Sequence, residues 1–164
     1  IDALNKRSSL DINERAIEIL QKNGIALSAG FVVMPDYTET DFKRIDAYVR
    51  ARPSIVLTDL TPLTPLPATD LYVEEQANVV THNREMYDLA HFVVPTKLPA
   101  REMNRLMRKY YLRVVWRAIR RLKLYRPRYA IKRHIPRLIA GTLRNAMLLA
   151  RAHDSLSVPV PEDN

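Results

Sequence analysis

The sequence contains no cysteine. Disulfide bonds, thiolate nucleophiles, cysteine-bound zinc and an iron–sulfur cluster held by this chain alone are therefore excluded. The histidines are few and scattered, at His82, His91, His134 and His153. Because no two of them have the spacing of paired helical metal ligands, we expect no metal site among them.

Long hydrophobic runs are also absent, since no apolar stretch approaches the roughly 18 residues of a membrane-spanning helix. Hydrophobic residues still make up 47% of the 164-residue chain, which indicates a packed core rather than a disordered composition. The chain opens on Ile1 rather than Met, so we expect it to be a piece of a longer protein.

The net charge of +8 is unevenly distributed. From Pro99 to Arg151, sixteen Lys and Arg residues accompany a single acid, Glu102, whereas the other residues carry ten basic and seventeen acidic side chains. The sequence therefore predicts an acidic first part and a strongly basic second part.

Helical patterns and apolar runs alternate in the first sixty residues. A helix is predicted over 11–23, with Asp11 and Glu14 as a capping box, followed by a strand over 25–34 that is covered on both faces. A second helix start at Thr38 and a second strand over 54–60 complete the pattern.

This order predicts an α/β fold with parallel strands, from a barrel or from a doubly wound sheet. Two strands alone do not make a stable sheet of this kind. We therefore expect further strands from the rest of the polypeptide or from self-association with a second copy.

Ligands of such folds bind beyond the C-terminal ends of the strands, here at MPDYTETD (34–41) and TPLTPLPATDLY (61–72). Pro62, Pro65 and Pro67 stiffen the second segment. A stiff loop either preorganises a ligand contact or only leads the chain away from the sheet.

Three stretches carry a family resemblance: LNKRSSLDINERAIEILQKNGIALSAGFVVMPDYTETDF, LTPLTPLPATDLY and THNREMYDLAHFVVPTKLP. In this order they resemble the radical SAM superfamily over roughly residues 4–98. The resemblance is greatest to the class with an N-terminal cobalamin-binding domain, which includes anaerobic magnesium-protoporphyrin ester cyclases, hopanoid methylases and phosphonate methylases.

The resemblance implies a partial (β/α)6 TIM-like barrel, with residues 1–98 as its C-terminal part and this chain holding the fifth and sixth strands. Family members bind S-adenosylmethionine across the barrel top, and a 4Fe–4S cluster on three cysteines cleaves it to a 5′-deoxyadenosyl radical. Those cysteines, spaced C-x3-C-x2-C, would lie upstream of Ile1.

The parent is therefore expected to be an enzyme, an oxidoreductase or methyltransferase that methylates, oxidises or cyclises an unactivated carbon. The chain alone is expected to be inactive. The resemblance leaves the substrate, the use of cobalamin and the catalytic residue open.

Six residues match the family positions that contact S-adenosylmethionine: Gly30, Val32, Met34, Leu63, Thr64 and Pro65. Met34 stands where a second glycine is usual, and Ala68 replaces a frequent glycine in the loop after the sixth strand. For Gly30 and Val32, simple packing of the barrel is the alternative interpretation.

A polar and aromatic group follows this loop, made up of Asn83, Tyr87, Asp88 and His91. These residues either face a substrate or belong to a surface turn and helix that cover the open edge of the barrel. We expect the second arrangement, because an exposed strand edge needs cover.

Residues 99–152 are predicted to form a basic helical extension, with helices over 99–125 and 136–152, and residues 153–164 a disordered tail. An apolar stripe runs along the first helix through Met103, Met107, Tyr110, Val114, Ala118, Leu122 and Tyr125. The additional apolar residues Leu112, Val115, Trp116 and Ile119 predict that part of this helix is packed on both sides.

Three interpretations of the extension stay open. It could be a cap docked on the barrel with Trp116 buried, an amphipathic helix at an anionic membrane surface, or a nucleic-acid-binding element that lacks a recognition motif. The rival function is accordingly a basic interaction module that binds lipid or nucleic acid without catalysis. The expected location is the cytoplasm, including the inner face of the membrane.

Overall fold

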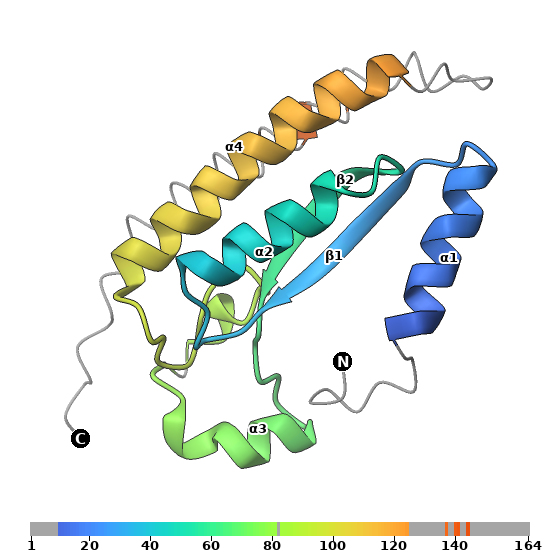
Figure 1. Ribbon diagram of the computed structural model, residues 1–164. Coiled ribbons are helices and arrows are strands. Elements are labelled where there is room, and N and C mark those ends of the chain that lie inside the picture. Colours follow the sequence, from blue (N-terminus) through green and yellow to red (C-terminus); the bar gives the residue numbers. More distant parts are fainter. Residues whose placement is uncertain (1–9, 82, 125–136, 138–139, 142–143, 145–164) are drawn as a thin grey trace.

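Two parallel strands form the centre of the computed structural model, which describes residues 10–81, 83–124, 137, 140–141 and 144. The elements follow one another as α1 (Leu10–Lys22), β1 (Leu27–Val33), α2 (Glu39–Arg50), β2 (Ile55–Pro62), α3 (Asp70–Glu75), the 3-10 helices η2 (Gln76–Asn78) and η3 (Arg84–Met86), and α4 (Ala100–Leu124). The mixed α/β fold class and the parallel pairing are confirmed (Figure 1).

Short-range signals in the sequence set most element boundaries. Gly24 has φ of +65°, the left-handed region that favours glycine, and it ends α1. The Thr38 amide donates a 2.9 Å hydrogen bond to Asp41 Oδ2, which confirms the second helix start. The first capping box is wrong, because α1 already begins at Leu10 and the Glu14 carboxylate binds α2 instead.

Glu14 ties α1 to α2 through two side chains. Its carboxylate accepts a 2.7 Å hydrogen bond from the Tyr48 hydroxyl and a 2.8 Å bond from Arg52 Nη2. The hydrogen bonds from Tyr48 and Arg52 lower the pKa of Glu14, while burial and the bond to Glu14 raise the pKa of Tyr48 to about 12. The contact therefore consists of an ionised carboxylate, a protonated phenol and a guanidinium near neutral pH.

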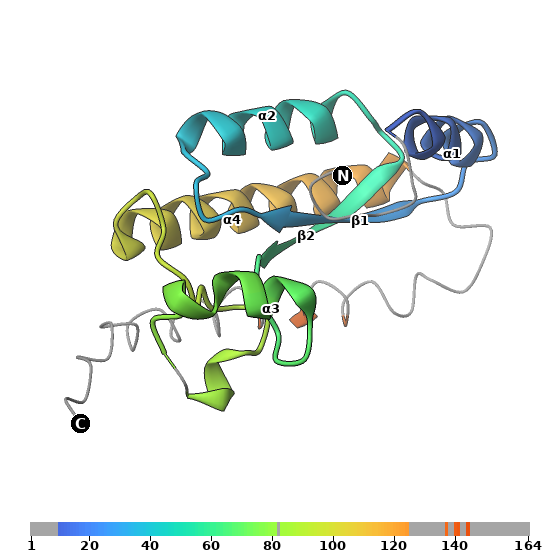
Figure 2. The ribbon, with the colours of Figure 1, turned by 90° about the horizontal axis from the view of Figure 1, so that it is seen from below.

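The hydrophobic core lies on one face of the sheet, where α2 and α4 pack (Figures 1 and 2). Val33 and Ile55 from the strands are buried there. The helices add Phe42, Ile45, Val49, Met103, Leu106, Met107, Tyr110, Tyr111 and Val114. The predicted stripe of α4 is confirmed from Met103 to Ala118, whereas the Leu122 and Tyr125 side chains lie outside the described part.

The sequence predicted that Leu112 and Trp116 are packed on a second side of the helix, but both side chains are exposed. Their exposed fractions are 58% and 63%, whereas Val115 is buried at 8%. The prediction was wrong because helical periodicity shows where an apolar stripe lies but not how wide its partner surface is. The predicted 136–152 helix and the 153–164 tail fall largely or wholly outside the described residues.

The outer edge of β2 is covered by α4. The Tyr111 hydroxyl accepts a 3.2 Å hydrogen bond from the Leu60 amide and donates a 2.7 Å bond to the Leu60 carbonyl oxygen. Both backbone groups of Leu60 are therefore satisfied without another strand. From the sequence, we expected the segment after Thr81 to cover the open edge of the sheet.

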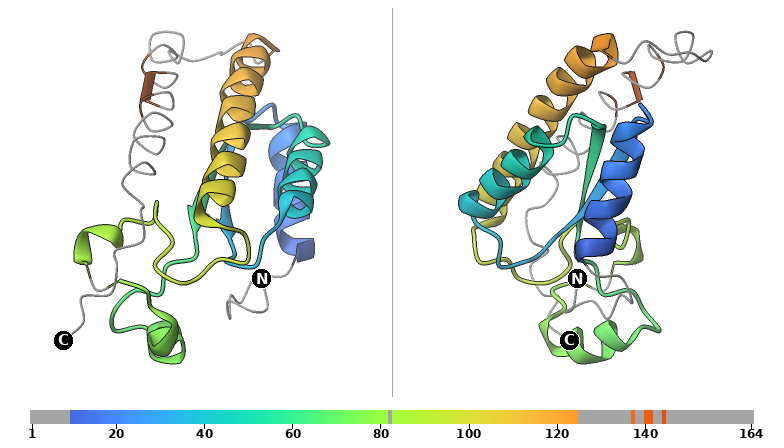
Figure 3. Two further views of the ribbon diagram at one scale, coloured as in Figure 1. Left: turned by 90° about the vertical axis from the view of Figure 1, so that its left-hand side faces the viewer. Right: turned by 45° about the vertical axis from the view of Figure 1, so that its right-hand side comes forward.

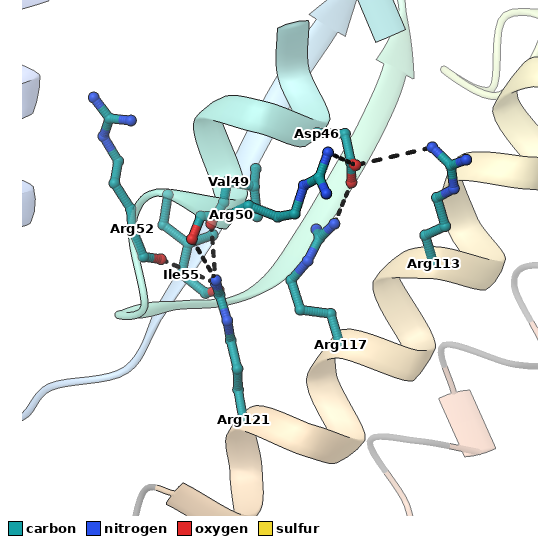
Figure 4. A network of polar contacts seen from close by, with 8 residues as sticks. All are labelled: Asp46, Val49, Arg50, Arg52, Ile55, Arg113, Arg117 and Arg121. Atoms are coloured by element: carbon teal, nitrogen blue, oxygen red, sulfur yellow. Dashed lines mark hydrogen bonds and ion pairs between the residues drawn. The ribbon is translucent and has the colours of Figure 1, made fainter. Parts of the chain in front are cut away.

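Arginines of α4 fix it against α2 (Figure 4). Arg117 binds the buried carboxylate of Asp46, which Arg50 also approaches at 3.2 Å. Arg121 donates to the carbonyl oxygens of Val49, Arg50, Arg52 and Ile55 at 2.5–3.0 Å. Arg121 thereby caps the C-terminal end of α2, where unpaired carbonyl groups and the helix dipole favour a cation.

Candidate ligand-binding face of the sheet

The second face of the sheet carries its most polar residues. The strand register pairs Ser28 with Leu57, Gly30 with Asp59 and Val32 with Thr61, and alternation along a strand places these six residues on the face opposite the core. Ser28, Gly30 and Asp59 are exposed, and the other three are half-buried. No described helix packs a hydrophobic core against this bare face, which corrects the prediction that β1 is covered on both sides.

Gly30 occupies open space on the bare face. A Cβ atom built at Gly30 meets no heavy atom within 4 Å, and its φ lies outside the left-handed region. Neither backbone conformation nor close packing within the described chain thus requires glycine here. The absence of a side chain leaves room for something that approaches this face from outside.

Most of the sequence-predicted residues lie at the C-terminal ends of the two strands. Val32 lies on the bare face, Met34 directly follows β1, and the Leu63 amide extends the pairing by donating to the Val33 carbonyl oxygen at 2.9 Å. Thr64 is buried at 8% and donates to the Pro62 carbonyl oxygen at 3.2 Å. Val32, Met34 and Leu63 therefore share the C-terminal end of the sheet, whereas Gly30 lies on the bare face in the middle of β1.

The proline-rich loop is firmly packed at this end. Pro62 and Pro65 are both fully buried. Because the Thr64 and Pro65 side chains are buried, these two residues could offer a ligand only their backbone groups. Ala68 then adopts φ of +69°, a conformation that explains why glycine would suit this position.

The polar group after the loop forms a local turn. The Asn83 side chain accepts a 3.0 Å hydrogen bond from the Glu85 amide, and the Tyr87 hydroxyl donates to the Thr81 carbonyl oxygen at 3.1 Å. The helix expected here is only the three-residue η3, while α3 and these turns collect near the strand ends (Figure 3).

Asp88 and His91 pair within this turn. Asp88 Oδ1 lies 2.9 Å from His91 Nδ1 and accepts bonds from the amides of Ala90 and His91. Burial raises the pKa of Asp88, but the bonds from His91 and Ala90 outweigh burial and leave that pKa below its ordinary value. An ionised Asp88 therefore stabilises the turn, and its oxygens are occupied by local donors.

Asp59 is a candidate site residue that sequence reasoning missed. It lies in the middle of β2, beside Gly30 on the bare face. The signal was present, because a carboxylate inside an apolar strand run is costly unless its face meets water or a polar ligand. The arrangement places a hydrogen-bond acceptor next to the open space at Gly30.

Metal ligands and membrane spans are not found in the part of the chain that the structure describes. No group of three His, Asp or Glu side chains there could hold a metal ion. No described helix is long and apolar enough to cross a bilayer.

Two curated proteins are similar to this chain. A hopanoid C-3 methylase from Methylococcus capsulatus is 29% identical over 102 residues, which are 62% of this chain and 19% of the methylase. An anaerobic magnesium-protoporphyrin IX monomethyl ester cyclase from Rubrivivax gelatinosus is 32% identical over 100 residues, or 60% of this chain and 17% of the cyclase.

The chain thus spans about a fifth of the length of these relatives. No family model and no solved structure matches it. Both relatives are named as enzymes, and the similarity covers a single segment of each.

Proposed function

We propose that this chain is the C-terminal part of a radical SAM enzyme and that its bare sheet face forms one wall of the S-adenosylmethionine pocket. The observation that carries the proposal is the β1–α2–β2 unit with one face filled by helices and the opposite face polar and open at Gly30. In α/β barrels the helices cover the outside of the strands, and ligands bind at their C-terminal ends. The similarity to a methylase and a cyclase supports the same assignment.

Two asymmetries of the sheet support a partial barrel. Tyr111 closes the outer edge of β2, as suits a final strand, whereas among the described residues β1 has β2 as its single neighbour. Parallel sheets are stable when both faces and most edges are covered. In the proposed barrel, the preceding strand would pair with β1 and the bare face would line the interior.

The residues present fit S-adenosylmethionine better than they fit its cluster. Gly30 and Val32 would leave room for the adenosyl group, and backbone groups of Leu63, Thr64 and Pro65 would meet its adenine edge. Asp59 would accept a hydrogen bond from a hydroxyl or amino group of the bound ligand. The 4Fe–4S cluster, which supplies the electron for cleavage, would take its cysteine ligands from outside this chain.

The proposed reaction class is methylation, oxidation or ring formation at an unactivated carbon. One relative is named for a methylation and the other for a cyclisation. We therefore propose the formation of a 5′-deoxyadenosyl radical, and we leave open which bond is finally formed on the substrate. Cobalamin would be a second cofactor if the parent carries the corresponding N-terminal domain. The fragment would contribute a binding wall and no cluster.

The proposal is tested by Gly30→Val in the full-length parent. A branched side chain would fill the open space on the bare face, and its Cβ atom meets no heavy atom within 4 Å. We expect S-adenosylmethionine affinity, measured by equilibrium dialysis, to fall by about tenfold or more, equivalent to about 1.4 kcal/mol of lost binding.

Ser28→Val is the matched control, because Ser28 lies on the same face of β1 but one pleat farther from the C-terminal ends. This variant should bind the cofactor nearly as well as the parent does. Equal affinity of both folded variants and the parent would place the pocket elsewhere.

A further inference from the structure

The outer side of α4 carries a dense basic surface that contains two exposed apolar side chains. Its exposed residues are Arg101, Arg105, Arg108, Lys109, Leu112, Arg113, Trp116 and Arg120. Trp116 is 63% exposed and Leu112 is 58% exposed, although the opposite side of the helix is fully packed in the core. Exposed Trp and Leu side chains that lie together and are bordered by polar groups are typical of interaction surfaces.

The basic side chains of α4 divide into two groups by their contacts. Arg117 and Arg121 point toward α2 and fix the helix in place, as Figure 4 shows. Lys109 and Arg113 reach acidic partners only at 3.7 Å and 3.8 Å, and they stay about half exposed. Such surface pairs contribute little, so these cations keep most of their capacity to attract an anion.

A groove between α2 and α4 adjoins this outer surface. Its volume is about 830 Å³, and its lining comprises Asp46, Arg50, Leu112, Arg113, Trp116, Arg117, Arg120 and Arg121. The lining contains five arginines and one buried carboxylate, which leaves it strongly positive. The Arg120 guanidinium lies 4.5 Å above the Trp116 ring, so charge and aromatic surface are presented together at the rim.

We propose that this outer surface of α4 binds the anionic surface of a lipid bilayer. Amphipathic helices that lie in the plane of a membrane combine flanking Lys and Arg with Trp and Leu that enter the headgroup boundary. The groove would accept a lipid phosphate, because arginine binds phosphate with paired donors. The proposal does not depend on the catalytic assignment.

Lipid is favoured over nucleic acid by the side chains themselves. The exposed residues named above include no Asn, Gln, Ser or Thr, whose amide and hydroxyl groups commonly supplement arginine in reading bases. Leu112 also has no role on a phosphate backbone, whereas at a membrane it gains from burial.

The test is co-sedimentation of the full-length parent with vesicles of phosphatidylglycerol and phosphatidylcholine, and with vesicles of phosphatidylcholine alone. We expect binding to the anionic vesicles only, weakening as salt screens the charges. Arg108→Gln together with Arg120→Gln should weaken binding by roughly 30-fold, since each cation near an anionic surface contributes about 1 kcal/mol.

The matched control removes the same charge elsewhere. The control is the double variant Arg15→Gln and Arg44→Gln. Arg15 lies on α1 and Arg44 on α2, and both side chains are exposed. This pair should leave vesicle binding within about twofold of the parent, since the charges lie away from the proposed surface. Trp116→Ala should weaken binding without changing its dependence on salt.

Three results would overturn the proposal. The first is absence of binding, or equal binding to neutral vesicles. The second is an equal loss in the two double variants. The third is single-stranded DNA that binds this surface more tightly than the vesicles do and displaces them, which would assign the surface to nucleic acid.

Discussion

Ala68 shows how a single backbone conformation limits the loop after β2. Its φ of +69° is a left-handed conformation that costs an L-residue with a Cβ about 1–2 kcal/mol. The buried Pro65 and the capping residue Thr69, whose hydroxyl accepts from the Tyr72 amide, hold the chain on both sides of this position. The loop keeps this strained residue because its neighbours determine the path.

We predict that Ala68→Gly raises the free energy of unfolding by about 0.5–1 kcal/mol. Relief of the left-handed conformation outweighs the greater entropy that glycine loses on folding. Ala51→Gly is the matched control, because Ala51 has φ of −68° at the end of α2 and the same substitution there should destabilise. Denaturant unfolding of the parent measures both, and the same sign for the two variants would contradict the account.

Single residues were the least predictable feature of the sequence. Asp59 and Tyr111 are ordinary residues in a strand and in a helix, and their roles follow from the register at Gly30 and from the free edge at Leu60. Trp116 belonged by periodicity to an apolar helix, yet the packing of α2 and β2 stops short of it. Exposure depends on tertiary partners that local patterns do not contain.

At the scale of elements, α4 is part of the sheet's packing and also its edge cover. Burial raises the pKa of Tyr111, and the phenol therefore stays protonated and able to donate to the Leu60 carbonyl oxygen. The division into barrel residues 1–98 and a helical extension over 99–152 stays a prediction from the sequence. In the structure, α4 fills the same core as both strands.

Tyr111→Phe should destabilise the α4–β2 contact by about 1–3 kcal/mol. The substitution removes the hydroxyl and leaves the amide and carbonyl of Leu60 without partners in a buried place. We expect faster hydrogen exchange of the Leu60 amide in the full-length parent. Tyr37→Phe, in a half-buried side chain outside this contact, is the control. Unchanged protection of Leu60 in Tyr111→Phe would contradict the assigned edge cover.

The elements themselves were largely predictable. The apolar runs 25–34 and 54–60 correspond to β1 and β2, and the long basic helix begins within one residue of its predicted start. Gly24 and Pro35 separate these elements by local backbone preference, which acts without tertiary context. The helix expected near Asn83 failed because side-chain bonds in that segment close turns instead.

At the scale of the molecule, the described residues form an incomplete layer structure. One sheet face and one edge of β1 lack packing partners within them, and α1 buries no residue while Ile12 and Ile19 are 60% and 52% exposed. Exposed apolar groups together with an unpaired strand edge indicate surfaces that other segments cover. The proposed barrel would supply such segments.

The measurement that tests the central claim most directly is production of 5′-deoxyadenosine by the full-length parent. The protein is reconstituted anaerobically with iron and sulfide, reduced with dithionite and supplied with S-adenosylmethionine, and the nucleoside is quantified by mass spectrometry. The account predicts at least stoichiometric 5′-deoxyadenosine, and a large loss of it in Gly30→Val but not in Ser28→Val. A reconstituted parent that forms no 5′-deoxyadenosine above a protein-free control would contradict the assignment to radical SAM chemistry.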